Sequence, residues 1–248
     1  MGRGVDDYSA VLTSVELIGE DVVYLRARCP ELACEVEPGQ FILLRDPAWG
    51  LDPLLMRPFA VAGVIGDDIE ILLQVVGRGT EMLAQRKPGD PLVVRGPMGR
   101  GFSKPSSSPV YVAGTLGSAP LLFARDRFGA GRFVLGVPNG RWESFVLWLK
   151  RRCPELEVFS DDGSLGSKGN SLKGLSPDED VSVMACGPGP MMAAMANMGL
   201  KDCQVSMESR MACGIGACSG CVIETSSGKK RVCADGPVFD LQEVVWNG

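Results

Sequence analysis

The stretch VYVAGTLG at residues 110–117 divides the sequence into two parts of different character. Residues 110–113 form a short apolar run that is typical of a buried strand. Residues 114–117 predict a glycine turn, and the run from there to Arg127 predicts a helix. A strand that passes through a turn into a helix is the repeating unit of parallel α/β sheets. We therefore expect such a sheet to begin here.

The sequence after this stretch keeps alternating between strand and helix patterns. Further strands are predicted at 133–137, 157–159 and 181–186, and helices at 142–151 and 191–198. Strands separated by helices favour a parallel sheet with helical crossovers. We therefore predict an α/β domain over residues 109–200.

The sequence before this stretch is rich in short β-patterns broken by Gly and Pro. The clearest strands are predicted at 22–25, 41–44, 69–76 and 92–94. Their spacing predicts an antiparallel barrel or sandwich, which we assign to residues 1–104. The segment KPSSSP at residues 104–109 predicts a linker to the α/β domain.

Composition narrows the class of protein. The 248 residues suit two or three domains, and the net charge of −5 argues against a general nucleic-acid binder. No apolar run reaches the ~18 residues of a membrane helix, and residues 1–10 lack the apolar core of a signal peptide. We therefore expect a cytoplasmic protein with neither a nucleic-acid nor a membrane partner. The chain has no histidine, so its chemistry must use a cofactor, thiolates, carboxylates or lysines.

Four of the 9 cysteines form the most specific pattern in the chain. They are Cys213, Cys218, Cys221 and Cys233. The spacing is C-x4-C-x2-C, then eleven residues and a fourth cysteine, and the first three match plant-type [2Fe-2S] ferredoxins. Glycines between them let the loop wrap closely and present its amides to sulfur. Zinc usually takes paired C-x2-C knuckles or histidines, and free cysteines rarely gather among so many glycines, but both remain alternatives.

Two segments of the N-terminal part indicate a site for FAD. Arg57-Pro58-Phe59-Ala60 begins a predicted strand, and the planar fork of an arginine can bond two pyrophosphate oxygens. Gly79 and Thr80 lie at the start of a predicted helix, where free N–H groups favour phosphate. The preceding strand contributes Leu72-Leu73-Gln74. Arg57 alone would be equally well explained as an ordinary strand-edge arginine.

Three loops of the α/β part indicate a site for a nicotinamide nucleotide. They are Gly114–Gly117, Asp161–Ser164 and Cys186–Pro188, and each follows a predicted strand. Ligands of open α/β sheets bind beyond the carboxyl ends of the strands. The first loop lacks the full G-x-G-x-x-G pattern, and Cys186 is equally well explained as a core thiol at a strand end.

Seven motifs occur along the chain in one order. They are RPFA (57–60), GRGT (77–80), GPMGRGF (96–102), DDGSLG (161–166), CGPGPM (186–191), ESRMACGIGAC (208–218) and RVCADGPVF (231–239). In this order they resemble the electron-transfer subunit of class-B dihydroorotate dehydrogenase, within the ferredoxin-reductase superfamily. The resemblance covers nearly the whole chain, and the cysteine block is its most specific part.

The resemblance implies a structure of three parts. These are an antiparallel Greek-key β-barrel that binds FAD (1–104), a parallel α/β domain that binds NAD (109–200) and a small C-terminal [2Fe-2S] domain (201–248). We predict that Cys213, Cys218, Cys221 and Cys233 hold the cluster. The predicted FAD contacts are Arg57, Pro58, Phe59, Ala60, Leu72, Leu73, Gln74, Gly79 and Thr80. No side chain is predicted to act as a catalytic acid or base on a substrate.

The resemblance also implies the reaction, in which dihydroorotate and NAD⁺ give orotate and NADH during pyrimidine (UMP) biosynthesis. A catalytic partner with FMN would oxidise dihydroorotate, and this chain would pass the electrons through the cluster and FAD to NAD⁺. The family assembles as a heterotetramer of two catalytic and two electron-transfer subunits. The chain departs from the family at Ala60, where Ser or Thr is usual, and at 113–117, where the usual run is richer in glycine.

Two other functions stay open on the sequence. The chain could be the diaphorase-type FAD/[2Fe-2S] subunit of a sulfhydrogenase or of a ferredoxin:NADP reductase complex, with the same cofactors and a different partner. It could also be a redox-sensing or scaffold protein that has lost nucleotide binding, for which Ala60 and the altered glycine turn are the only support.

Overall fold

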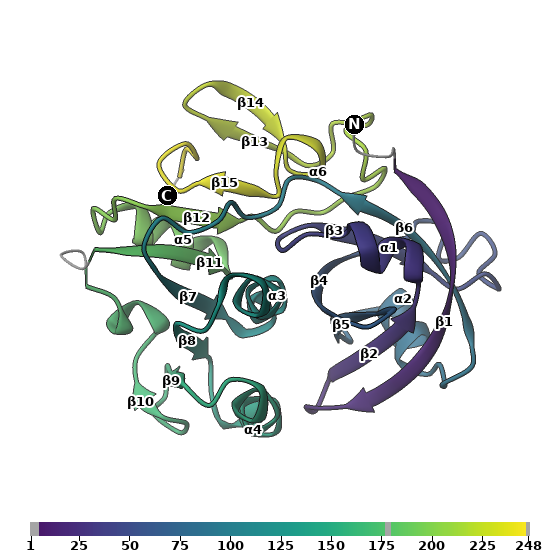
Figure 1. Cartoon of the computed structure of the whole chain (residues 1–248), viewed down its shortest axis with the longest axis horizontal. Coiled ribbons are helices and arrows are strands. Elements are labelled where there is room, and N and C mark those ends of the chain that lie inside the picture. The colour runs from purple at the N-terminus through teal and green to yellow at the C-terminus, as the bar shows by residue number, and fades with distance from the viewer. Residues whose placement is uncertain (1–4, 177–179, 247–248) are drawn as a thin grey trace.

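A computed structural model describes residues 5–176 and 180–246 of the chain. The N-terminal part is a closed barrel of antiparallel strands, in the order β1-β2-β5-β4-β3-β6 (Figure 1). The strands are β1 (Asp6–Leu17), β2 (Val22–Arg28), β3 (Phe41–Arg45), β4 (Arg57–Ile65), β5 (Asp68–Gln74) and β6 (Pro91–Met98). The sequence left a barrel and a sandwich open, and the structure confirms the barrel.

The alternation of side chains along β5 shows how the barrel is filled. Ile71 and Leu73 are fully buried inside the barrel, where the short helices α1 (Pro30–Glu35) and α2 (Arg78–Ala84) add Leu32 and Leu83. Leu72 points to the opposite side, because successive residues of a strand face opposite ways. It packs with the core of the α/β part.

The second part is a seven-stranded sheet in the order β10-β9-β8-β7-β11-β12-β15. Its strands are β7 (Ser108–Gly114), β8 (Arg132–Val137), β9 (Leu156–Ser160), β10 (Ser167–Lys168), β11 (Val181–Cys186), β12 (Cys203–Ser206) and β15 (Val238–Asp240). All neighbours are parallel except β12 and β15. The crossover helices are α3 (Ser118–Phe128), α4 (Glu143–Arg152) and α5 (Gly189–Ala196). The predicted parallel α/β architecture is confirmed.

Element boundaries differ from the sequence-based ones by a few residues. Helix α5 begins at Gly189 and ends at Ala196, where the apolar pattern predicted 191–198. The predicted linker 104–109 is shorter, because Ser108 and Pro109 already pair with β11. These ends are fixed by strand pairing and by the proline at the helix start, which an apolar pattern does not report.

The C-terminal segment combines a separate hairpin with strands of the main sheet. The hairpin is formed by β13 (Val222–Thr225) and β14 (Gly228–Arg231), and the short helix α6 (Val232–Asp235) follows it. Strands β12 and β15 lie on either side of this hairpin in sequence and extend the parallel sheet (Figure 1). The domain limits 1–104, 109–200 and 201–248 stay predictions; their first four and last two residues, and 177–179, lie outside the described residues.

Helix α3 joins the barrel to the sheet. It lies between β7 and β4 (Figure 1), and its Phe123 is buried among the apolar residues of the barrel interior. An ionic contact also joins the two parts, since Arg152 of α4 bonds Glu70 of β5. In the described parts of the chain, no helix has the length and apolar character to cross a membrane.

Candidate functional site

A cavity of about 340 Å³ lies where the barrel meets the sheet. Among the residues that line it from the barrel are Pro58, Phe59, Ala60, Leu72 and Gln74. Five of the nine predicted flavin contacts therefore line one cavity. Their strands explain this: β4 and β5 are neighbours in the barrel, and β4 packs against α3.

Arg57 and Gly79, two more of the predicted flavin residues, lie in contact beside this cavity. A Cβ added to Gly79 would lie 2.6 Å from Nε of Arg57, so the guanidinium group rests directly on the glycine at the start of α2. Arg57 also donates a hydrogen bond to the carbonyl of Leu55, and its guanidinium carbon lies 5.9 Å from the ring centre of Trp49. The arginine fork is thus held next to free amides of a helix start, which is a suitable arrangement for pyrophosphate oxygens.

Leu73 and Thr80 have a different place from the other predicted residues. Leu73 is fully buried inside the barrel, so its side chain faces away from the cavity. The Thr80 hydroxyl accepts hydrogen bonds from the amides of Val76 and Gly77, at 3.0 and 3.1 Å, and donates one to the Gly77 carbonyl at 2.8 Å. It shapes the turn before α2, and its hydroxyl already has its partners.

Two of the three expected nucleotide loops, Gly114–Gly117 and Cys186–Pro188, meet at the carboxyl ends of β7 and β11, whereas Asp161–Ser164 follows β9, two strands from β7, and does not line the cavity. A Cβ on Gly117 would lie 2.1 Å from the Cys186 carbonyl oxygen, and one on Gly114 would lie 2.5 Å from Cδ of Pro188. Only glycine permits this approach of the two turns. Leu116, between these glycines, lines the cavity together with Ala119 and Pro120 at the start of α3. The sheet therefore supplies the wall opposite the barrel strands.

Cys186 is both a buried strand-end residue and part of the cavity wall. Its exposed fraction is 4%, and burial raises the pKa of its thiol well above the ordinary value, so the thiol is neutral. The cavity also contains Met207, Glu208, Ser209 and Met211, which were not predicted as site residues. Desolvation raises the pKa of the Glu208 carboxyl. The only sequence signal for this wall was the ESRM segment that precedes the cysteines.

The cysteine loop places backbone amides on its sulfur atoms. Cys213 Sγ accepts from the Cys218 amide at 3.4 Å, and Cys221 Sγ accepts from the Cys233 amide at 3.4 Å. The Gly216 amide donates to Cys233 Sγ at 3.1 Å. Gly214 and Gly216 adopt φ values of 71° and 81°, the left-handed region that glycine adopts without strain. This tight winding turns the amides toward the thiols.

These amide bonds link the four cysteines in two pairs, Cys213 with Cys218 and Cys221 with Cys233. Amide hydrogen bonds, first from Cys218, lower the pKa of Cys213 to about 6, while burial raises that of Cys233 to about 12. Within residues 5–176 and 180–246, no group of three Cys, Asp or Glu side chains converges as the ligands of a single metal ion would. Two pairs of sulfur donors with nearby amides fit the ligand requirement of a two-iron cluster.

The cysteine loop begins and ends at the cavity. Met211 lines the cavity and lies two residues before Cys213, and Pro237 lines it four residues after Cys233. Two residues of chain span at most about 7 Å. The loop also packs on the barrel, since a Cβ on Gly214 would lie 2.9 Å from Leu43 and 3.1 Å from Met98. The cysteine loop and the cavity are therefore adjacent.

Comparisons with known proteins identify the family. Residues 208–245 match the model of the iron-sulfur cluster binding domain of dihydroorotate dehydrogenase B. The electron-transfer subunit of NAD⁺-dependent dihydroorotate dehydrogenase B from Clostridium acetobutylicum is 36% identical over 225 residues, which cover 86% of this chain and 88% of the relative. The chain belongs to this family of electron-transfer subunits. A homologue of the same subunit from Aquifex aeolicus is 38% identical and covers 92% of this chain and 94% of its own length.

Solved structures agree with this membership. The structure of an NADH-dependent reduced ferredoxin-NADP oxidoreductase superimposes with a TM-score of 0.81 at 26% identity, covering 96% of this chain and 90% of that one. The ferredoxin reductase of carbazole 1,9a-dioxygenase shares the fold, with a TM-score of 0.66 at 21% identity. Of the three functions that the sequence left open, membership of the dihydroorotate dehydrogenase B family favours the first.

Proposed function

We propose that this chain passes electrons from a dihydroorotate-oxidising catalytic subunit to NAD⁺, as the electron-transfer subunit of dihydroorotate dehydrogenase B. It is an oxidoreductase component of pyrimidine biosynthesis, with FAD, a [2Fe-2S] cluster and NAD as its cofactors. The observation that carries the proposal is the continuity of the cysteine loop with the cavity wall through Met211 and Pro237. It puts a site for one-electron transfer next to a site of flavin size.

The residues divide the work as follows. We assign Arg57 and the backbone at Gly79 to the FAD pyrophosphate, because the guanidinium already rests on that helix start. The cavity residues of β4 and β5 are assigned to the flavin ring: Pro58, Phe59, Ala60, Leu72 and Gln74. Leu73 and Thr80 support the strand and the turn from behind. When bound, FAD supplies the exchange between one-electron and hydride chemistry.

The cluster and the nucleotide occupy opposite sides of this cavity in the proposal. Cys213, Cys218, Cys221 and Cys233 bind the iron atoms, and the loop amides compensate the negative charge on sulfur. The turns after β7 and β11 present Leu116 and Cys186 to the side on which the nicotinamide must approach. The neutral Cys186 thiol leaves that side without an added negative charge.

The family name implies a catalytic partner subunit. We infer that this partner contains FMN, that the complex contains two of each chain, and that it works in the cytoplasm. We also infer the three parts 1–104, 109–200 and 201–248. In this division, β12 and β15 of the third part complete the sheet of the second.

The test is co-expression with the dihydroorotate-oxidising subunit, followed by an assay of dihydroorotate-dependent NAD⁺ reduction. The expected complex contains flavin and two iron atoms per copy of this chain and forms NADH only when dihydroorotate is added. Cys218→Ser should abolish this activity, while Cys34→Ser, at an exposed cysteine far from the loop in sequence, should not. A pure, flavin- and iron-loaded complex that reduces no NAD⁺ would contradict the proposal. Activity only with ferredoxin or hydrogen as donor would support the diaphorase alternative.

A further inference from the structure

The peptide between Gly216 and Ala217, inside the cysteine loop, is bonded by a single arginine. Arg231 donates a hydrogen bond from Nη1 to the Gly216 carbonyl oxygen at 3.1 Å. This peptide is trans, so its N–H group, which belongs to Ala217, points opposite to the carbonyl. The amide that donates to Cys213 Sγ is that of Cys218, in the next peptide along the chain, at 3.4 Å. Holding the oxygen therefore fixes the peptide that leads into this donor.

The same glycine also carries a donor to the other cysteine pair. The Gly216 amide, in the preceding peptide, donates to Cys233 Sγ at 3.1 Å, while the carbonyl of the same residue accepts from Arg231. The approach is as close as glycine permits: a Cβ on Gly216 would lie 2.9 Å from Ala234 and 3.2 Å from Nη1 of Arg231. One guanidinium group thus anchors the cysteine loop at the residue that lies between the amide donor to Cys233 and the peptide leading to the amide donor to Cys213.

Arg231 is itself fixed by Asp235. Its Nε donates to Oδ2 of Asp235 at 3.1 Å, and its backbone amide donates to the same oxygen at 2.8 Å. The pair spans the end of β14 and the helix α6 that contains Cys233. Because two donors of one planar fork bond to different groups, lysine cannot reproduce the arrangement.

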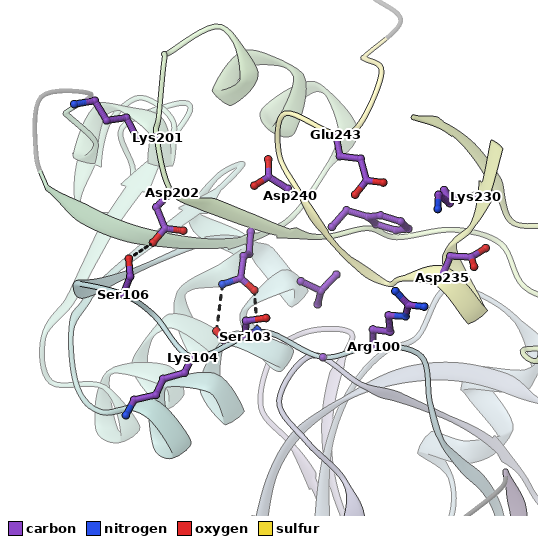
Figure 2. A pocket seen from close by; sticks show the side chains of 14 residues that line it. Arg100, Ser103, Lys104, Ser106, Lys201, Asp202, Lys230, Asp235, Asp240 and Glu243 are labelled. Carbon is purple, nitrogen blue, oxygen red and sulfur yellow. Dashed lines mark hydrogen bonds between the residues drawn. The ribbon is translucent and has the colours of Figure 1, made fainter. Parts of the chain in front are cut away.

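A neighbouring lysine provides a natural comparison. Lys230 lines a charged cleft of about 620 Å³, which also contains Arg100, Asp235 and Glu243 (Figure 2). Among the described residues, Lys230 makes no hydrogen bond to the cysteine loop. It carries the same charge as Arg231 on the same strand without contacting the peptide. The cleft itself contains cations and anions in equal number, so it indicates no single ligand.

We propose that Arg231 is a positioning residue that raises the reduction potential of the [2Fe-2S] cluster by anchoring the cysteine loop at the Gly216 carbonyl, so that the amides of Gly216 and Cys218 stay directed at sulfur. Hydrogen bonds to the cluster sulfurs and local net charge set the potential of an iron-sulfur cluster. Amides aimed at sulfur stabilise the reduced form, which carries one more negative charge. The inference rests on the proposed function, because it assigns the cluster to these four cysteines.

The experiment compares midpoint potentials in the complete complex with the catalytic subunit. The EPR signal of the reduced cluster is followed during redox titration of the wild type, Arg231→Gln, Arg231→Lys and Lys230→Gln. Both Arg231 variants should bind the cluster and show a reduction equilibrium at least tenfold less favourable, a shift of about 59 mV to lower potential for one electron. Lys230→Gln, which removes a charge only, should shift the equilibrium less than threefold.

Three results would overturn the inference. Arg231→Lys could have the wild-type potential, which would assign the effect to charge alone. Arg231→Gln could shift no further than Lys230→Gln. Both Arg231 variants could fail to bind iron while the wild type binds it, which would make Arg231 an assembly residue. A wild-type complex that shows flavin but no cluster signal would instead contradict the proposed function, and the inference with it.

Discussion

Arg152→Leu should weaken the contact between the barrel and the sheet and lower Tm more than the loss of an exposed ion pair does. Arg152 bonds both carboxylate oxygens of Glu70, at 3.0 and 2.8 Å, across the boundary between α4 and β5. Tyr24 donates to the same carboxylate, and burial with this bond raises the pKa of its hydroxyl, which therefore remains a donor. The guanidinium also lies 5.4 Å from the ring centre of Trp148.

The size of the effect follows from the burial of Glu70. Its side chain is 1% exposed, whereas that of Arg152 is 24% exposed. Removing one partner of a buried ion pair costs about 3–5 kcal/mol, because the other charge is left buried and unpaired. Since Arg152 is partly hydrated, we expect the lower end, about 3 kcal/mol. At roughly 2–4 °C per kcal/mol for a chain of this size, Tm should fall by about 6–12 °C.

The assay is thermal unfolding of the FAD-loaded protein, measured by calorimetry. Glu157→Gln is the control: Glu157 pairs with Arg132 at 3.0 Å within the sheet, both side chains are about two-fifths exposed, and such pairs contribute about 0–1 kcal/mol. The double variant Glu70→Gln/Arg152→Leu removes the unpaired charge and should be more stable than Arg152→Leu alone. The reasoning is refuted if Arg152→Leu lowers Tm no more than the control, or if the double variant is the less stable one.

Three further substitutions test the site and the fold. Gly79→Ala places a methyl group 2.6 Å from Arg57 Nε and should displace the guanidinium. Loss of a charged hydrogen bond worth about 1.5–3 kcal/mol should weaken FAD binding about 10- to 150-fold in a fluorescence titration. Gly50→Ala, where the added methyl group meets open space, should leave FAD binding unchanged. Asp7→Asn removes the bond to Arg95 that lowers the pKa of the Asp7 carboxyl below 3.8, and should cost up to about 1 kcal/mol of stability at pH 7. Because the pKa of Asp7 is depressed in the folded protein, the difference in stability from the wild type should vanish as the pH falls through that pKa, which acid unfolding curves would show. Thr115→Gly should raise the free energy of unfolding by about 0.5–1 kcal/mol in chemical denaturation. A left-handed φ of 48° costs a residue with a Cβ about 1–2 kcal/mol, and glycine loses about 0.5–1 kcal/mol in chain entropy. Thr115→Ala keeps a Cβ and should give no gain.

The sequence predicted the elements and the cluster motif because both are local. Strand–turn–helix alternation reports the parallel sheet, and the C-x4-C-x2-C spacing is contained in nine residues of one loop. The departure from the family at Thr115 was visible too. What the sequence could not show is its backbone angle: the structure gives φ 48°, which explains why glycine is the easier residue there.

Which of the predicted flavin residues face the cavity depends on the register of strand pairing, which the sequence does not show. Leu72 and Leu73 are equivalent as letters, but the pairing of β5 with β2 and β4 turns Leu72 outward and Leu73 into the barrel. The cavity wall from Met207 to Met211 and the contact between Arg152 and Glu70 join segments far apart in sequence. Such contacts follow from how the parts pack, and no local pattern reports them.

The sheet edge fixes the two ends of the segment that contains both the cavity wall and the cysteine loop. The chain leaves the sheet at Ser206, passes through the cavity wall and the cysteines, and returns at Val238, which pairs directly with Ser206. Paired residues of antiparallel strands lie about 5 Å apart, so both ends of this 31-residue excursion are fixed at one point. The same sheet carries the turns after β7 and β11 that form the opposite wall. The sheet therefore sets where this segment begins and ends, and the packing of Gly214 on Leu43 and Met98 holds the cysteines against the barrel beside the cavity.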